Sequence, residues 1–385
     1  MAAHVPSLGT SLHARRRIWP LAQRLAHWLL AAATLTALVS GLWLPEWMLP
    51  LHLLAGIAAG LVVLFRLVAG LLGPPPLAFR TLPLSTEALR RHLALLRHLR
   101  PPPHLAHNPL GSLMVVALLT TVGLLVLTGV VVWGGQEKAG PFAAFVGYDL
   151  AAALRPLHRL LGWTVLVLIV GHVLGVLVES RLARESLVIA MITGRKRVDA
   201  AAVDAGLLLQ ADPVACRRAV VTGLAVAGAV LLGGVALATL PPRGVFDIRY
   251  PQVYLDECGA CHDAHHPSLL PPESWARLLT GLDDHFGEDA SLDDATAREI
   301  RRFLEETAAL PWDTEAAREI RATLPDGPDP PRITASTWWR MRHGWIEEGM
   351  FRHPRVGGRL NCGACHADAA TGLFADAAIR LPTDP

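Results

Sequence analysis

The stretch Cys258-Gly-Ala-Cys261-His262 is repeated later in the chain as Cys362-Gly-Ala-Cys365-His366. Two cysteines separated by two residues and followed directly by histidine are typical of covalent haem attachment. The two thiols bind the vinyl groups of one porphyrin, and the adjacent imidazole ligates its iron. Zinc bound by both Cys pairs is the alternative, but it requires four ligands in one place and gives no reason for a histidine after each pair. The repeat therefore predicts two covalently bound c-type haems.

The chain is too apolar for an ordinary soluble protein. Of its 385 residues, 52% are hydrophobic, and the mean hydropathy is +0.37, so part of it is expected in a membrane. Residues 1–242 carry net +11 (20 Lys and Arg against 9 Asp and Glu), whereas residues 243–385 carry net −9 (15 against 24). The basic half fits membrane loops, and the acidic half fits a basic protein partner or a solvated surface. Neither half indicates nucleic acid.

Five apolar runs are long enough to cross a bilayer. They are bounded by Pro, Gly or charged residues and cover Leu25–Leu44, Leu51–Leu72, Leu110–Trp133, Leu157–Val178 and Ala219–Leu240. The first run could also be a secretory signal peptide, but it is longer than such cores usually are and lacks a convincing cleavage site. We expect five membrane-spanning helices.

Basic residues indicate the orientation of these helices. Lys and Arg gather in alternate connections, within residues 15–24, 80–100 and 181–218, and are sparse within 45–50 and 134–156. Positively charged loops remain cytoplasmic, so we expect a cytoplasmic N-terminus and a C-terminal half on the other side. Haem attachment, which bacteria complete outside the cytoplasm, independently requires the same placement. The expected location is the bacterial inner membrane, with a periplasmic C-terminal domain.

The expected fold is all-α. A four-helix bundle and a fifth anchoring helix precede a small domain of helices and loops, since that domain shows no alternating strand pattern. The expected parts are a cytoplasmic N-terminus (1–20), a membrane domain (21–200), a cytoplasmic loop with the fifth helix (201–242) and the outer domain (243–385).

Histidines within membrane spans are costly and are first treated as functional. His158 and His172 lie fourteen residues apart on one helix, about 21 Å along its axis and on nearly the same face. With the orientation above, His52 lies at the level of His158, and His27 at the level of His172. We therefore predict two b-type haems, an outer one between His52 and His158 and an inner one between His27 and His172. Helix-end histidines reaching the interface are the alternative.

Other polar residues of the membrane half are less decisive. Arg66 either extends to the cytoplasmic surface or binds a propionate of the inner haem. We expect His92, His98, His104 and His107 to be solvated.

The membrane half resembles the bacterial cytochrome b561 family, which includes the b-type subunits that anchor nickel-iron hydrogenases. The resemblance covers about residues 15–200 and rests on His27-Trp28, His52 with Arg66, His107-Asn-Pro-Leu-Gly111, and His158-Arg-Leu-Leu-Gly-Trp163 followed by His172. Such proteins usually end after the fourth span, which implies that the fifth is an adaptor here.

Each covalent haem has one ligand in its motif, His262 or His366, and the remaining histidines must supply the second. His265 and His266 follow His262 too closely to reach the opposite face of the same haem. His285 lies 23 residues after His262 and His343 lies 23 residues before His366, so we predict His285 for the first c haem and His343 for the second. His353, and the pair His265-His266, remain alternatives.

The second half is similar to the dihaem cytochromes c of purple bacteria. The similarity spans about residues 250–382 and rests on Leu269-Leu-Pro-Pro272, the run 283–290 around His285, Asn361 before the second motif, and Arg380-Leu-Pro382. It implies bis-histidine ligation of both haems. One known role in that family is electron delivery to a small oxygen-binding cytochrome. The pair His265-His266 departs from the pattern.

These features together predict electron transfer through two b haems and two c haems. We expect electrons to flow from membrane quinol to a periplasmic cytochrome or another soluble acceptor, a quinol:cytochrome c-type oxidoreductase activity. The alternative is a relay or anchor subunit of a larger respiratory or photosynthetic complex. Membrane lipid, quinone and a soluble electron-transfer protein are the expected partners.

Overall fold

The computed structural model describes residues 13–75, 77–98, 107–182, 184–199, 212–327 and 330–382. They form two compact units. The first unit comprises Met1–Trp43, Leu51–Leu127 and His158–Gly233, and the second comprises Leu44–Pro50, Thr128–Leu157 and Gly234–Pro385. The second unit thus includes the ends and connections of several long helices.

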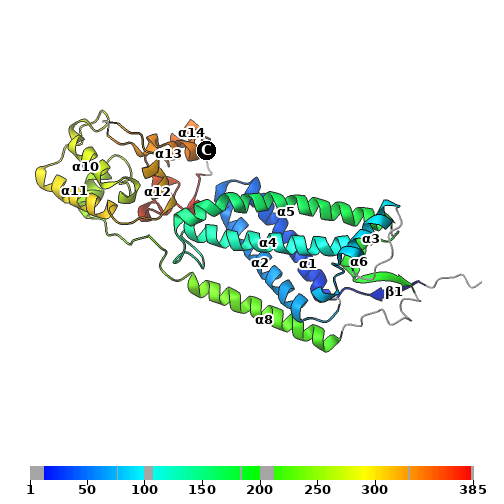
Figure 1. Ribbon diagram of the computed structural model, residues 1–385. Coiled ribbons are helices and arrows are strands. Elements are labelled where there is room, and N and C mark those ends of the chain that lie inside the picture. Colours follow the sequence, from blue (N-terminus) through cyan, green and yellow to red (C-terminus); the bar gives the residue numbers. More distant parts are fainter. Residues whose placement is uncertain are drawn as a thin grey trace, which may run out of the picture. The chain divides into compact units, whose positions relative to one another are not determined.

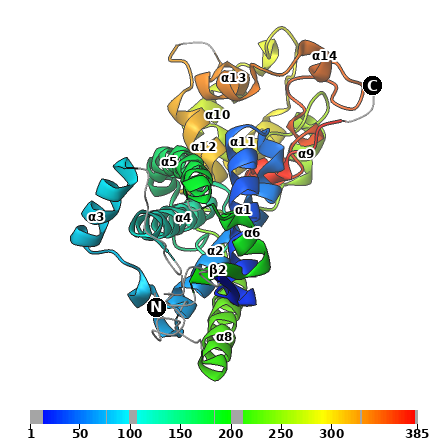
Figure 2. The ribbon, with the colours of Figure 1, turned by 90° about the vertical axis from the view of Figure 1, so that its right-hand side faces the viewer.

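Long apolar helices make up most of the first unit. They are α1 (Leu21–Leu42), α2 (Leu49–Leu72), α4 (Pro109–Gln136), α5 (Tyr148–Leu182) and α8 (Pro213–Leu237), with α2, α4, α5 and α8 extending into the second unit. All five are long and apolar enough to cross a membrane. Figures 1 and 2 show α4 and α5 side by side, with α1 and α2 next to them. The expected all-α fold with five membrane helices is confirmed.

The core of the bundle is small because most apolar side chains of these helices face outward. Ala33, Leu38, Ala59, Val63, Val122 and Val165 form a buried cluster. On α8, Val221, Leu224 and Leu232 are 57%, 60% and 72% exposed. The hydrocarbon core of a bilayer offers such surfaces an apolar environment. Helix α8 contacts α2 at Gly223, where an added Cβ would lie 2.8 Å from the Phe65 ring.

Shorter elements accompany the bundle. They are α3 (Thr86–Arg97), α6 (Leu187–Thr193), a 3₁₀ turn η2 (Phe79–Thr81), and strands β1 (His13–Arg17) and β2 (Arg195–Asp199). The strands pair antiparallel, with His13 opposite Asp199, although no strand was expected there. Gly194 makes the pairing possible, because its positive φ of 77° ends α6 and its carbonyl accepts the amides of Ile18 and Trp19 at 2.8 and 3.2 Å.

The second unit consists of short helices around an aromatic core. Its helices are α9 (Gln252–Cys258), α10 (Pro272–Thr280), α11 (Asp294–Ala308), α12 (Glu315–Ala322), α13 (Thr337–His343) and α14 (Glu348–Phe351). The 3₁₀ turns are η1 (Glu46–Met48), η3 (Pro267–Leu269), η4 (Leu282–Asp284), η5 (Ile333–Ala335), η6 (Cys362–Ala364), η7 (Ala369–Thr371) and η8 (Asp376–Ala378). Tyr254, Trp275, Ile300 and Leu304 are central to the core.

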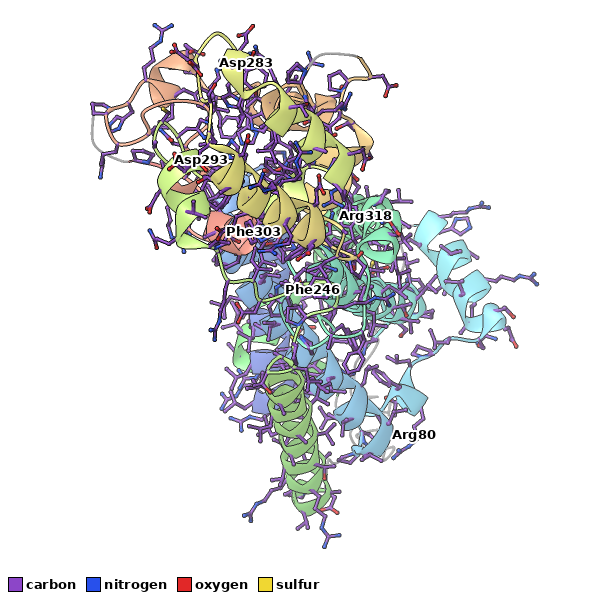
Figure 3. All side chains as sticks on the ribbon, turned by 90° about the vertical axis from the view of Figure 1, so that its left-hand side faces the viewer. Arg80, Phe246, Asp283, Asp293, Phe303 and Arg318 are labelled. Atoms are coloured by element: carbon purple, nitrogen blue, oxygen red, sulfur yellow. The ribbon has the colours of Figure 1, made fainter. Side chains whose placement is uncertain are left out.

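Side-chain caps fix where several of these helices begin. Asp293 accepts the amides of Ala295 and Thr296 at 2.9 and 3.1 Å at the start of α11, where Figure 3 labels it. From the other face of α11, Phe303 packs against Tyr254 with ring centroids 5.1 Å apart. An N-cap of this kind contributes about 1 kcal/mol.

A buried ion pair joins the connection between α4 and α5 to Asp313, which lies two residues before the start of α12. Lys138 is 5% exposed, and its Nζ lies 2.6 Å from Oδ2 of Asp313. Asp313 also accepts the amide of Tyr148 at 3.0 Å, and its own amide donates to the carbonyl of Gly244. Arg318 of α12, labelled in Figure 3, binds Asp149 at 2.7 Å, but both of these side chains are exposed. Both pairs lie within the second unit.

We predict that Asp313→Ala destabilises the second unit by about 3 kcal/mol, because it leaves the buried ammonium of Lys138 unpaired. Arg318→Ala is the matched control and should cost less than about 1 kcal/mol, because its ion pair is exposed. Urea unfolding of the purified chain in detergent measures both. Equal effects of the two substitutions would contradict a special role for the buried pair.

Candidate haem sites

Four pairs of histidines face each other at closely similar separations. The ring centroids are 6.4 Å apart for His27 and His172 and 6.1 Å apart for His52 and His158, both in the first unit. In the second unit they are 6.4 Å apart for His262 and His285 and 6.0 Å apart for His343 and His366. These are the four pairs predicted from the sequence.

A shared iron explains this separation. Imidazole nitrogens bind metals at about 2 Å, and each ring centroid lies about 1 Å behind its nitrogen, so two imidazoles on one iron are about 6 Å apart. When two imidazoles bind one iron, each ring plane contains the axis through the iron and its bound nitrogen. A shared iron is therefore compatible with any angle between the two ring planes. The four pairs fit one six-coordinate iron each.

Helices α2 and α5 present the histidines of the outer pair. Nδ1 of His52 lies 2.9 Å from the carbonyl of Ala37 and 3.4 Å from Oγ of Ser40. His158 forms a hydrogen bond with the main chain of Leu125. Such hydrogen bonds orient metal-binding imidazoles and leave the other nitrogen free for the metal. Gly41 is needed here, because an added Cβ would lie 2.7 Å from the His52 ring.

The inner pair comes from α1 and α5. The Nδ1 atom of His27 is buried without a hydrogen-bond partner. The His27 ring meets Trp28 edge-on, with the centroids 5.1 Å apart. A buried nitrogen without a partner is unusual in a folded protein. The missing partner at Nδ1 is expected if a group bound at Nε2 fixes the position of the His27 ring.

Arg66 of α2 is buried, with 8% of its surface exposed. Its Nη1 donates to the carbonyl of Leu77 at 2.9 Å, and the guanidinium lies over the ring of Phe79 at 4.4 Å. Other guanidinium N–H groups remain available to an anion. Binding of a propionate by Arg66 stays a prediction.

The first c-haem motif lies at the end of α9 and in the following loop. Nδ1 of His262 lies 2.8 Å from the carbonyl of Asp263, which directs Nε2 away from the chain. His285 follows η4 in a tight turn, where Phe286 has a positive φ of 60° and Gly287 donates to Asp284 at 2.9 Å. Arg332 lies over the Phe286 ring at 4.1 Å and supports this strained turn.

The alternatives to His285 have different surroundings. The ring of His265 is stacked on His262 with centroids only 4.9 Å apart, too close for an iron between them. His266 is buried and hydrogen-bonded to Ser268 at 2.8 Å, with its ring edge-on to Trp312. The geometry therefore favours His285 as the second ligand of the first c haem. His265, which lies next to His262, remains the alternative ligand.

The second c-haem pair combines α13 with the motif at η6. Nδ1 of His343 lies 3.0 Å from the carbonyl of Trp339, and the His343 ring stacks on Trp339 at 4.5 Å. Burial, the first cause, lowers the pKa of His343 to about 4 and also lowers that of His366. Neutral imidazoles have the lone pair that a metal needs. The reserve candidate, His353, accepts the amide of Arg355 at 3.2 Å.

The two covalent motifs are hydrogen-bonded to each other. The amide of Asp263 donates to Oδ1 of Asn361 at 3.1 Å, and the amide of Gly363 donates to Oδ2 of Asp263 at 2.6 Å. Among the described residues, no group of three or more His, Cys, Asp or Glu side chains could hold a metal ion by itself. The contact brings the two haem-binding segments together.

Two expectations about other histidines were wrong. His92 is 2% exposed rather than solvated, and the ring of His107 packs edge-on against Trp19 at 4.9 Å. Burial, the first cause, lowers the pKa of His107 to about 4. Long-range packing of loop residues has no local sequence signal. His104 lies outside the described residues, and His98 ends α3.

Sequence reasoning also missed residues that shape the second c-haem site. Trp47 and Glu46 of η1 line the cavity around His343 and His366, together with Arg342. Their only sequence signal was a Trp and an acidic residue in a short connection. Asp263 and Asn361 flank the motifs, but their contact joins positions far apart in the chain.

Comparisons with known proteins give matches to both halves of the chain. Residues 18–194 match the family model described as prokaryotic cytochrome b561, and residues 254–374 match that of dihaem cytochrome c. A diheme cytochrome c from Rhodobacter sphaeroides is 34% identical over 33% of this chain and 98% of its own, with a TM-score of 0.27. One from Shewanella baltica is 30% identical over 35% and 96%, with a TM-score of 0.27. A search of curated proteins finds no match.

The two family models cover the two halves that contain the histidine pairs, in the order expected from the sequence. The chain therefore contains haem b and haem c and transfers electrons through them. By these matches residues 18–194 are similar to prokaryotic cytochrome b561, and residues 254–374 are similar to dihaem cytochrome c.

Proposed function

We propose that this membrane protein oxidises a quinol and passes the electrons through two b haems and two c haems to a soluble acceptor. The observation that carries the proposal is the set of four histidine pairs at 6.0–6.4 Å, two in helices suited to a membrane and two at covalent attachment motifs. Bis-histidine coordination leaves no open position on the iron for a substrate. The sites therefore suit electron transfer better than chemistry at the metal.

The proposed ligands follow the pairs. His27 and His172 hold an inner b haem, and His52 and His158 hold an outer one. The c haems are held by His262 with His285 and by His366 with His343, with thioether bonds from Cys258, Cys261, Cys362 and Cys365.

The proposed location is the inner membrane, with the N-terminus in the cytoplasm and the dihaem domain in the periplasm. Basic connections at alternate ends of the five helices support this orientation. The acceptor is a soluble cytochrome or a similar protein, and the acidic charge of residues 243–385 suits a basic partner.

To test the function, the purified chain is mixed with duroquinol under anaerobic conditions. We expect the quinol to reduce all the haems, and a soluble c-type cytochrome to reoxidise them repeatedly. Visible absorption of the b and c bands measures both steps. Reduction only in the presence of a larger enzyme complex would instead favour a relay or anchor subunit.

The b-haem assignment predicts which substitutions act together. His52→Ala and His158→Ala should each remove the outer haem, and His27→Ala and His172→Ala the inner one. His92→Ala is the control, since that buried histidine is not among the proposed haem ligands. Pyridine haemochrome analysis should give equal amounts of b and c haem in the wild type and half the b haem in each variant. Loss of the same haem from His27→Ala and His158→Ala would overturn the pairing.

The c-haem assignment predicts a change of spin state without loss of the cofactor. His285→Ala and His343→Ala should each convert one ferric c haem from low spin to high spin, because water or an empty position replaces imidazole. Both haems should stay attached through their cysteines. Electron paramagnetic resonance measures the spin state, with His353→Ala as the control. An unchanged low-spin spectrum in His285→Ala would assign that role to His265 or His266.

A further inference from the structure

The cavity around His343 and His366 has one wall from the connection between α1 and α2. Glu46 and Trp47 of η1 line it beside Trp345 and Arg342, which come from α13 and the residues after it. All of these residues belong to the second unit. A connection between two membrane helices therefore forms part of a covalent haem site.

Two kinds of contact fix this wall. The rings of Trp47 and Trp345 are stacked, with centroids 5.9 Å apart and planes 28° apart. Arg342, whose side chain is 16% exposed, binds Glu46 and Asp376 at 2.5 Å each. Asp376 begins η8, which packs on η1 and follows the second haem motif. An arginine between two carboxylates in a partly buried site holds both segments in a defined geometry.

The same connection leads directly to the outer b-haem histidines. His52 lies on α2, five residues after Trp47, which is about 8 Å along a helix axis. On α5, Arg155 lies 3.7 Å from Glu315 of α12 and only three residues before His158, about 5 Å along the axis. Both histidines thus follow closely after segments packed on the dihaem domain, whereas His27 and His172 do not.

The first c-haem site has a different environment. Cys261 is exposed, and so are Asp283 and Asp293, which lie at the two ends of the loop that carries His285 (Figure 3). The contacts of His262 and His285 come from Asp263, His265, Phe286 and Glu288, all in the dihaem domain. Phe286 itself is 37% exposed. This site opens to solvent, and the hydrogen bonds of Asp263 connect it to the second motif.

We propose that electrons enter the dihaem domain at the pocket of His343 and His366 and leave it from the pocket of His262 and His285. Trp47, Trp345 and Arg342 are positioning residues that hold the entry pocket against η1, within the second unit. Each step moves one electron, oxidising one ferrous centre as one ferric centre is reduced. No bond forms, and no proton is gained at the ligating histidines. This order rests on the proposed function.

The positioning role is tested by Trp47→Leu in the full chain, with Trp47→Phe as the matched variant that keeps an aromatic ring. After mixing with duroquinol, reduction of the b band should proceed at the wild-type rate in both. Reduction of the c band should slow by about tenfold in Trp47→Leu and recover in Trp47→Phe. A wild-type c-band rate in Trp47→Leu would overturn the role of the tryptophan.

Arg342 is tested by the potential of the c haem beside it. Arg342→Gln leaves Glu46 and Asp376 without their cation, so the ferric form is favoured and the midpoint potential of one c haem should fall. Arg342→Lys keeps the charge and should keep the potential closer to the wild-type value. Equal potentials in all three proteins would remove Arg342 from the proposal.

The order of electron transfer through the two c haems is tested with His343→Ala and His285→Ala under carbon monoxide. This test does not depend on the folding of the Trp47 variants. Carbon monoxide binds the opened ferrous haem and traps its electron. In His343→Ala, duroquinol should leave the first c haem ferric. In His285→Ala, the second should still be reduced. The opposite pattern would overturn the order. A wild-type chain in which duroquinol reduces no haem would instead overturn the proposed function.

Discussion

Under the proposed ligation, the fold would depend on one requirement, that two imidazoles reach one iron. This fixes the separation of the rings at about 6 Å, and each pair must therefore be held by elements that do not move apart. In the first unit, packed helices meet this requirement, and Gly41 leaves the space that the His52 ring occupies. In the second unit, where helices are short, side-chain caps, a strained turn at Phe286 and the stacking of His343 on Trp339 meet it.

Sequence reasoning succeeded where the signal is local or periodic. Apolar runs predicted the five helices. Because helix geometry is regular, the fourteen residues between His158 and His172 predicted that both lie on nearly the same face of one helix. It failed where distant segments meet. No local sequence signal predicts the pairing of residues 13–17 with residues 195–199, the burial of His92, or the packing of Trp47 on Trp345. Such contacts depend on how whole elements pack, which no short window of sequence contains.

The assignment of second ligands to the two c haems shows how far local sequence signals reach. Spacing disfavoured His265 on reach, and in the structure its ring stacks on His262 with centroids 4.9 Å apart. Symmetry of spacing suggested His285 and His343, but symmetry is no physical cause. The causes are the turn that ends at Glu288 and the C-terminal end of α13, which present these two side chains. The first is recognisable from its glycine and acidic residues only after the fold is known.

Fusion of the two cytochromes changes the physics of transfer between them. Separate proteins must first collide, whereas tethered sites meet at an effective concentration set by the linker. A flexible linker would still allow many unproductive orientations. Within the second unit, the buried Lys138–Asp313 pair, the Arg342 bridge and the Trp47–Trp345 stack each join residues near a helix end to residues after Gly234. Breaking the Lys138–Asp313 pair would cost free energy, because it would leave the buried ammonium of Lys138 unpaired.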